Sequence, residues 1–241
     1  MNEPQAAHSS RPLFMSQKLT LTVMLGGPSA EREVSLRSGA AVAKALRSLG
    51  HTVHELDPKT PDWTLPAGTQ AVFLALHGTY GDRSYIDAPL ITPLGISPDR
   101  VSFFDSLAED LEAECQRVNE FIASRGGLDI IMVGIGMNGH LGLNEPGTSF
   151  DTYAHISDLE EVTASVGQKY FQSETPLTQG ITVGLKHFLE AKVAIVLANG
   201  AKKKGIIQRV LEESVNESLP ASALKIHSNG YLWVDAAADP A

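Results

Sequence analysis

The sequence has 241 residues, of which 43% are hydrophobic and 20% are charged. These proportions are ordinary for a soluble globular protein, and the length allows one large α/β domain or two small ones. The formal net charge of −9 lacks the basic surplus that a nucleic-acid binder usually carries. No apolar run reaches the roughly 18 residues of a membrane helix. We therefore expect no nucleic-acid partner and no membrane span.

The single cysteine, Cys115, cannot form an internal disulfide, which fits a reducing, cytoplasmic location. Residues 1–17 contain no apolar run of signal-peptide length, and we expect them to form a flexible leader. After the leader, the apolar run at 19–25 ends in the turn signal Gly26-Gly27-Pro28-Ser29. A helix is then predicted with Ser35 as its N-cap and Gly50 as its stop. Two further strands are predicted at 51–56 and 71–76.

The rest of the chain also alternates strands and helices. A helix is predicted at 106–125 with Cys115 on its buried face, followed by the strongest strand signal of the chain at 129–135. Further helices are predicted at 158–171, 185–191 and 203–213, and further strands at 101–104, 192–198, 223–226 and 231–235. This order predicts a doubly wound α/β fold with a mostly parallel sheet, a Rossmann-like or flavodoxin-like three-layer sandwich. Ligands are expected beyond the carboxyl ends of the strands.

The segment that carries chemistry follows the strand at 129–135 and reads GIGMNGHLGLNEP over 134–146. Four glycines in nine residues let the backbone approach a ligand closely. His140 and Glu145 stand five residues apart, and a carboxylate can fix the tautomer of a histidine that titrates near neutral pH. From spacing alone, a tight strand-to-helix turn with an incidental histidine is the alternative.

The same segment, continued by Thr148-Ser149-Phe150-Asp151, resembles the glucosamine-6-phosphate deaminase family, most closely its galactosamine-6-phosphate branch. The resemblance covers residues 84–236. It implies deamination and isomerisation of a hexosamine 6-phosphate without a metal or cofactor. His140 matches the ring-opening histidine and Glu145 the glutamate that supports it. Asn138 stands where the glucosamine enzymes carry an aspartate, and an amide can only orient its neighbours by hydrogen bonds.

The resemblance also gives the substrate-binding residues. Lys169 and Lys203 match positions that hold the sugar phosphate, and Gly136 and Gly139 belong to the loop that approaches it. The expected ligand is a sugar phosphate, or a phosphate or sulfate anion. Without the resemblance, the run 202–204 would be read as a solvated helix start, although basic residues there oppose the helix dipole.

The first part of the chain resembles a different family. Residues 19–82 are similar to the opening segment of D-alanine–D-alanine ligase, through 26–39 and 75–82. The resemblance places Glu31 and His77 near the ligase's first D-alanine site, and surface turn residues are the alternative for both. No ATP-grasp segment is present, so ligase activity is not expected.

We therefore divide the chain into the leader 1–17, a ligase-type segment 18–83 and a deaminase-type segment 84–241, joined near 81–84 within one α/β domain. This division predicts an engineered chimera without efficient native catalysis. Two alternatives remain open, sugar-phosphate binding without turnover and weak deaminase activity. The resemblance implies that a phosphate loop and an enolising aspartate should precede Ser84, and neither is found in this sequence. In the active alternative, Asp82 or Glu31 would replace the enolising base and 26–29 the phosphate loop. A homo-oligomer could cover surfaces that missing parts leave bare.

Overall fold

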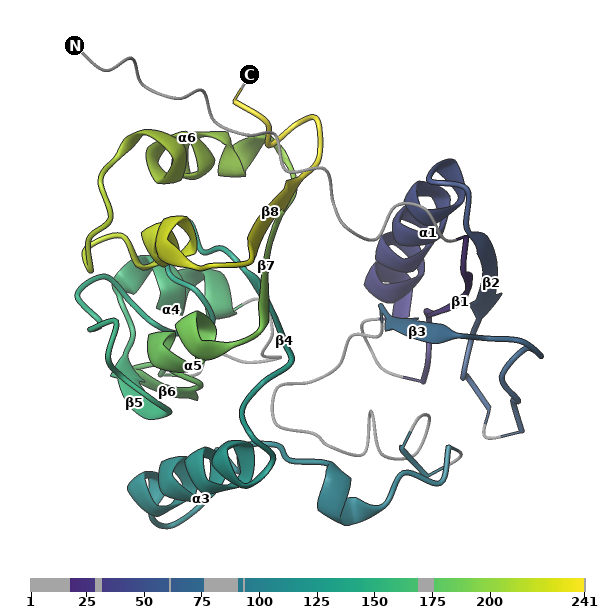
Figure 1. Cartoon of the computed structure of the whole chain (residues 1–241), viewed down its shortest axis with the longest axis horizontal. Helices are drawn as coiled ribbons and strands as arrows, with labels where there is room; N and C mark the ends of the chain where they lie inside the picture. The colour runs from purple at the N-terminus through teal and green to yellow at the C-terminus, as the bar shows by residue number, and fades with distance from the viewer. Residues whose placement is uncertain are drawn as a thin grey trace. The chain divides into compact units, whose positions relative to one another are not determined.

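The computed structural model describes residues 18–28, 32–60, 62–75, 91–92, 94–168 and 176–240. The chain forms two compact units, 1–97 and 98–241, which we describe separately as the N-terminal and C-terminal units. Each unit contains a three-stranded parallel sheet with helices, which confirms the predicted α/β class with parallel sheets (Figure 1). That all the segments share one domain stays a prediction, and the proposed leader lies outside the described residues.

In the N-terminal unit, the central strand β1 (Thr20–Met24) pairs in parallel with β2 (Thr52–Leu56) on one side and β3 (Ala71–Leu74) on the other. The helix α1 (Arg32–Ser48) connects β1 to β2, since two parallel strands need a crossover connection. The small core is built from Val23, Leu25, Ala43 and Ala75, against which side chains of α1, β2 and β3 pack. Gly50 follows α1 with a φ of 88°, which supports its predicted role as the helix stop.

Ser35 lies inside α1, which begins at Arg32, so its predicted role as the N-cap is wrong. Its fully buried hydroxyl instead accepts a hydrogen bond from the Gly26 amide and donates one to the Ala75 carbonyl, both at 2.7 Å. One hydroxyl therefore connects the ends of two neighbouring strands to the first turn of the helix.

The Gly-rich turn after β1 is held by groups of its own unit. The Gly26 amide donates to Ser35, and the Gly27 amide donates to Asp57 Oδ1 at 3.0 Å. Asp57 also forms an ion pair with Arg32, which lowers the pKa of the Asp57 carboxyl mainly through their hydrogen bond. Because both amides already have partners and a carboxylate lies beside them, this turn is unsuited to replace a phosphate loop.

In the C-terminal unit, β7 (Val193–Ala198) lies between β4 (Ile130–Gly134) and β8 (Gly230–Val234). The helices α5 (Leu185–Glu190) and α6 (Lys204–Glu212) lie on one side of these strands (Figure 1). They bury their apolar side chains against β4 and β7 together with the 3₁₀ helix η5 (Pro220–Ile226), and Phe188, Leu185 and Ile207 are among the largest fully buried side chains.

The unit also contains elements outside this sheet. Helix α3 (Leu111–Ser124) starts at Asp110, whose carboxylate caps it by accepting from the Ala113 amide at 2.8 Å. Cys115 on this helix is buried, which confirms that it belongs to the core. Strands β5 (His155–Asp158) and β6 (Gln179–Thr182) form an antiparallel pair. The shorter helices are η2 (Pro98–Arg100), α4 (Glu161–Gly167) and η4 (Ala201–Lys203).

Several predicted elements differ from the structure. Residues 101–104 do not form a strand, and this segment is bonded to α3 through Arg117, which donates to the Phe103 carbonyl at 2.6 Å. The predicted strand at 223–226 is part of η5. The predicted helix at 158–171 is replaced by the end of β5 followed by α4, whose described part ends at Gly167. The predicted start of α3 at 106 is also too early, and Leu107 is 91% exposed.

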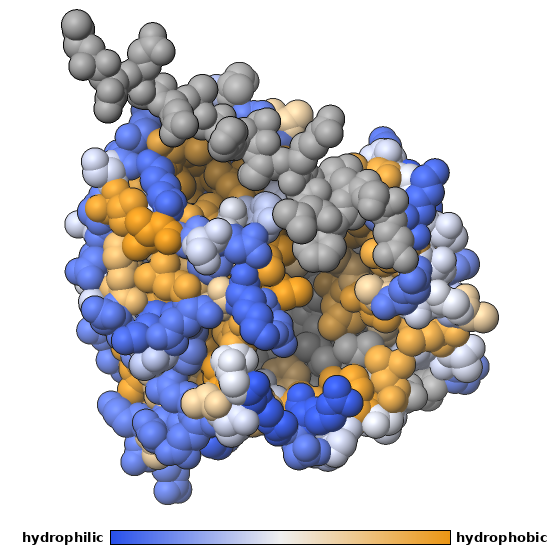
Figure 2. All heavy atoms as spheres, in the orientation of Figure 1, coloured by the Kyte–Doolittle hydropathy of each residue, from blue (hydrophilic) through white to orange (hydrophobic). Residues whose placement is uncertain are grey.

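No helix in the described part of the chain is long and apolar enough to cross a membrane. Apolar side chains are nevertheless exposed in places, including 56% of Leu211 and 55% of Trp233, and Figure 2 shows hydrophobic patches among the hydrophilic surface. A single exposed apolar side chain is common in folded proteins.

Replacing Ser35 by alanine tests the three-way contact in the N-terminal unit. The Ser35→Ala variant leaves a buried amide and a buried carbonyl without a partner, and such groups cost about 1–3 kcal/mol each. We expect a loss of about 2 kcal/mol or more in the free energy of unfolding, measured by urea titration. Ser48→Ala removes an exposed hydroxyl of the same helix and should change stability by less than about 0.5 kcal/mol. Equal stability of the two variants would contradict this account.

Candidate active site

The segment 135–146 leaves the carboxyl end of β4 and folds back on itself. Its Leu141 is almost fully buried and forms β-bridges with Ile135 and Asn144. The Gly136 amide donates to the His140 carbonyl at 2.8 Å. This tight return places the His140 side chain over the start of the loop, at the strand end where α/β proteins hold their ligands.

Two glycines of this loop are required by close contacts within the protein. A Cβ atom on Gly136 would lie 2.4 Å from His140 Cε1 and Nε2, so the imidazole ring rests against the bare backbone. Gly139 has a φ of 91°, and a Cβ atom there would lie 2.4 Å from Leu219 Cδ1. The Gly139 carbonyl also accepts from the Ala221 amide at 2.9 Å, which ties the loop to η5. The glycines therefore position His140 and dock the loop on the core.

His140 and Glu145 lie together, with His140 Nδ1 3.4 Å from Glu145 Oε1. Both side chains are largely buried, with 16% and 6% of their surface exposed. Thr163 Oγ1 lies 3.1 Å from the same Nδ1 atom. Since a carboxylate can only accept hydrogen bonds, this environment favours the tautomer with its proton on Nδ1 and a lone pair on Nε2. The ring can then accept a proton from a bound ligand.

Asn138 bridges two carboxylates. Its Nδ2 group donates to Glu145 Oε2 and to Glu160 Oε2, each at 2.6 Å, and its Oδ1 accepts from the His140 amide at 3.3 Å. All the hydrogen-bonding groups of this side chain are engaged, which is the orienting role expected of an amide at this position. The sequence analysis missed Glu160 and Thr163, because they come from the region of α4, more than twenty residues beyond their partners.

The protonation of His140 reflects opposing effects. Burial lowers the pKa of His140 below its ordinary value of 6.5, and the charge of Lys203 lowers it further, while Glu145 and Glu160 raise it. Burial is the largest effect, so the neutral imidazole is favoured near neutral pH. The charge of Lys203 therefore acts in the same direction as burial.

Lys203 lies at this site, whereas its neighbours Lys202 and Lys204 are exposed. It is partly buried, and its Nζ atom donates to the Ile135 carbonyl at 2.5 Å, at the point where β4 passes into the loop. A functional role for one lysine of the run stays a prediction. Among the other predicted site residues, Lys169, Asp82, Glu31 and His77 lie outside the described residues, as does the junction at 81–84. Within the described ranges, no group of three or more His, Cys, Asp or Glu residues could hold a metal ion.

Comparison with known proteins identifies the family. The family model described as "Glucosamine-6-phosphate isomerases/6-phosphogluconolactonase" matches residues 84–233, more than half of the chain. The "Putative deaminase AgaI" of Escherichia coli (strain K12) is 35% identical over 212 residues, which cover 87% of this chain and 82% of that protein. The chain belongs to the glucosamine-6-phosphate isomerase/6-phosphogluconolactonase family.

Other relatives in this family share parts of the chain. A glucosamine-6-phosphate deaminase of Staphylococcus epidermidis is 43% identical over 137 residues, 56% of each chain. The chain therefore aligns with little more than half the length of that relative. The solved structure of a monomeric glucosamine-6-phosphate deaminase matches with a TM-score of 0.62 and 28% identity, covering 92% of this chain and 87% of that one.

The family likeness extends before Ser84. The AgaI alignment is longer than the part of the chain from Ser84 to its end, and the structural match covers 92% of the chain, so both include part of the N-terminal segment. These findings give no evidence of a D-alanine–D-alanine ligase segment. The predicted ligase origin of 18–83, and the chimera inferred from it, are therefore unsupported.

The pKa of His140 can be moved in both directions by single substitutions. Glu145→Gln removes a charge that raises the pKa of His140, and Lys203→Met removes one that lowers it. We expect the pKa to fall in the first variant and to rise in the second, followed by NMR titration of the His140 ring protons. Because the folded pKa lies below the unfolded one, His140 should also make the protein less stable as the pH falls below 6.5. A pKa that moves in the same direction in both variants would contradict this account.

The two carboxylates on Asn138 explain why an aspartate is unfavourable here. Asn138→Asp would place a third carboxylate against Glu145 and Glu160 and remove both hydrogen bonds. We expect a loss of about 1–3 kcal/mol in the free energy of unfolding at pH 8, measured with urea. Adding Glu160→Gln should recover part of that loss, because an amide again lies beside the aspartate. A double variant no more stable than Asn138→Asp would contradict the explanation.

Proposed function

We propose that this protein binds a hexosamine 6-phosphate and converts it into a ketose phosphate with release of ammonia. The observation that supports this best is the buried pair of His140 and Glu145, held by Asn138 on a loop at the end of β4. The printed names of the relatives support the same activity, since AgaI is a putative deaminase and the S. epidermidis relative is a glucosamine-6-phosphate deaminase.

In this proposal, His140 opens the sugar ring. The reaction requires a proton to leave the anomeric hydroxyl and another to reach the ring oxygen, and a neutral imidazole can carry out both transfers in turn. Glu145 Oε1 lies 3.4 Å from Nδ1 and favours the proton there, which leaves the lone pair of Nε2 to act on the substrate. Protonation of His140 would then draw its ring toward the buried carboxylate of Glu145, because their charges attract at low dielectric.

The phosphate is proposed to bind to lysines. Lys203 is already placed beside the loop, and Lys169 is the second cation implied by the family resemblance. The turn at Gly26 and Gly27 is a weak candidate, since its amides donate to Ser35 and Asp57. A phosphate there would have to displace both partners and approach a carboxylate.

The enolising base is proposed to be one of three carboxylates. Asp82 remains a candidate from the sequence, and Glu31 is the other. Glu160 is an additional one, because its carboxylate is exposed to solvent and joined to Glu145 through Asn138. Exchange of the substrate C2 proton with deuterium oxide distinguishes the three candidates. The variants are Asp82→Asn, Glu31→Gln and Glu160→Gln, and only the one that lacks the base should lose this exchange.

The test of the proposed function is ammonia release from galactosamine 6-phosphate and glucosamine 6-phosphate. We expect activity on at least one of them, reduced about 10²-fold or more in His140→Ala, as is usual when a general acid–base group is removed. His54→Ala, which changes a half-buried histidine of β2, should leave the rate within about twofold, with folding verified by thermal melting.

Two results would contradict this proposal. Activity that survives in His140→Ala would show that another group opens the ring. Absence of ammonia release from the folded protein would contradict the enzymatic function, and calorimetry with the same two compounds would then test sugar-phosphate binding without turnover. Gel filtration of the same sample tests the predicted homo-oligomer.

A further inference from the structure

The Nδ1 atom of His140 has a closer partner than Glu145. Thr163 Oγ1, on α4, lies 3.1 Å from it, whereas Glu145 Oε1 lies 3.4 Å away. Hydrogen bonds between a ring N–H and an oxygen span about 2.7–3.2 Å, so the hydroxyl is within that range and the carboxylate is beyond it. Glu145 Oε1 is buried and has no hydrogen-bond partner among the described residues. The hydrogen bond to the ring is therefore the one with Thr163.

The Thr163 hydroxyl is directed to the ring and not to its own helix. Hydroxyls in helices often donate to a carbonyl one turn earlier, as Ser124 does to Phe121 in α3. Thr163 forms no such bond, and its contact with His140 is its only side-chain hydrogen bond within the described ranges. The side chain is partly buried, and rotation about χ1 of a β-branched residue is restricted in a helix. The hydroxyl is therefore held in place beside Nδ1.

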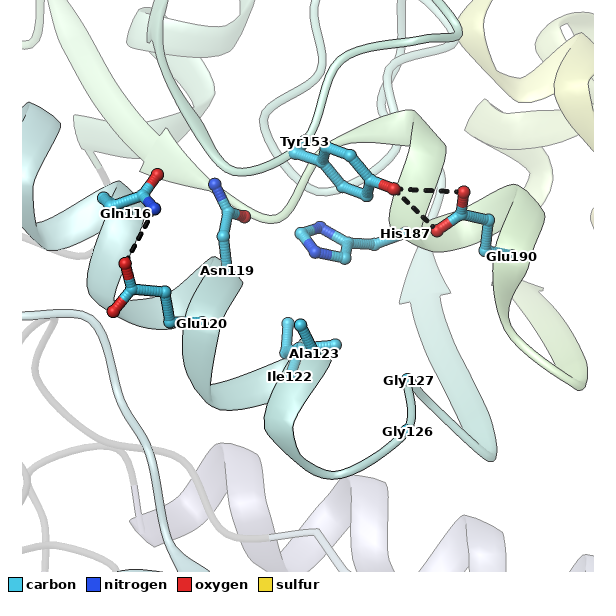
Figure 3. A pocket seen from close by; sticks show the side chains of 10 residues that line it. All are labelled: Gln116, Asn119, Glu120, Ile122, Ala123, Gly126, Gly127, Tyr153, His187 and Glu190. Atoms are coloured by element: carbon cyan, nitrogen blue, oxygen red, sulfur yellow. Dashed lines mark hydrogen bonds between the residues drawn. The ribbon is translucent and has the colours of Figure 1, made fainter.

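Burial alone does not give a histidine such a partner. His187 of α5 is the comparison within the same unit, and it lines the cavity that Figure 3 shows. Its Nδ1 atom is buried but has no hydrogen-bond partner in the described part of the chain. That cavity shares no lining residue with the loop 135–146. The hydroxyl beside His140 is therefore a specific feature of its site.

The same turn of the chain also holds Asn138. Glu160, which directly precedes α4, accepts from Asn138 Nδ2 at 2.6 Å, and Thr163 stands three residues later. Side chains three residues apart on a helix lie on one face. No residue of α4 is buried. Polar contacts, rather than burial in the core, therefore join this turn to the loop 135–146.

The two groups near Nδ1 have different effects. The charge of Glu145 favours a proton on Nδ1, but its oxygen is too distant to fix the direction of the ring. The Thr163 oxygen lies at hydrogen-bond distance and can accept that proton. The carboxylate therefore selects the tautomer, and the hydroxyl orients the ring.

We propose that Thr163 is a positioning residue for His140. Its hydroxyl accepts the Nδ1 proton and holds the ring in one orientation, so the lone pair of Nε2 keeps one direction. The reaction that this orientation serves rests on the proposed function. In it, Nε2 takes the proton of the anomeric hydroxyl and returns a proton to the ring oxygen. The bond from C1 to the ring oxygen breaks with its electron pair on oxygen, which leaves an aldehyde at C1, and the Nδ1 proton stays on the imidazole throughout.

NMR of the full-length protein tests the hydrogen bond without any assay of activity. The probe is the Nδ1 proton of His140 in ¹⁵N-labelled protein at pH 8, where the ring is neutral. In Thr163→Val, which replaces the hydroxyl by a methyl group, we expect this proton to exchange with water about fivefold faster. Thr163→Ser retains the hydroxyl and should keep the exchange rate of the unaltered protein. The ring signals of His187 are the internal control and should not change.

Kinetics test whether this orientation serves the reaction. Thr163→Val should lower kcat for ammonia release about tenfold and leave KM within about twofold, because a misdirected base slows the chemistry without removing a substrate contact. Thr163→Ser should restore kcat. Ser165→Ala removes an exposed hydroxyl of the same helix and should change neither constant. If no hexosamine phosphate releases ammonia, the proposed function fails, whereas exchange of the Nδ1 proton still decides the positioning of the ring.

Several results would contradict the proposal. These are an unchanged Nδ1 exchange rate in Thr163→Val, the same loss of activity in Thr163→Ser, an equal loss in Ser165→Ala, or a raised KM at unchanged kcat. The last result would mean that the hydroxyl contacts the substrate itself. Thr163→Ala is a second variant without the hydroxyl, and it keeps the test valid if Thr163→Val does not fold.

Discussion

The hydrogen bonds of Asn138 are the contacts on which the site depends. A buried carboxylate is costly unless it is paired, and the amide of Asn138 satisfies one oxygen of Glu145 while also holding Glu160. The other oxygen of Glu145 is left for His140. Without this amide, the carboxylates of Glu145 and Glu160 would lie near each other with no shared donor, so the local structure of the proposed site depends on the three hydrogen bonds of one side chain.

Two glycines of the loop leave the space that this arrangement needs. The His140 ring rests on Gly136, where any side chain would collide with it, and Gly139 packs directly on Leu219. The same core that buries Leu141 against β4 and β7 therefore fixes the position of the imidazole. Burial also keeps the imidazole neutral, which is the form that can accept a proton. The burial of the His140 ring thus sets both its position and its protonation.

The sequence predicted the parts of the site that are local in the chain. The strand at 129–135 and the loop after it were recognisable, because apolar periodicity and closely spaced glycines are short-range signals. Glu160 and Thr163 were missed, since only the tertiary fold brings them to the loop. Ser35 was assigned to a helix cap from its residue type, whereas the fold uses its hydroxyl to connect two strands.

The ligase resemblance of the first segment rested on a short motif. A short motif such as 26–39 can resemble another family, because many α/β proteins use a glycine-rich turn between a strand and a helix. Alignments over most of the chain weigh more than such a motif, and they place the chain in the glucosamine-6-phosphate isomerase/6-phosphogluconolactonase family. The proposed function, unlike the fold, rests on the side chains around His140.

The most direct test of the central claim is ¹³C NMR of galactosamine 6-phosphate labelled at C1, incubated with the purified protein. If the site around His140 opens and deaminates the sugar, the anomeric carbon signal will be replaced by the hydroxymethyl signal of a ketose phosphate. An anomeric signal that persists unchanged with galactosamine 6-phosphate, and likewise with glucosamine 6-phosphate, in the presence of folded protein would contradict the claim.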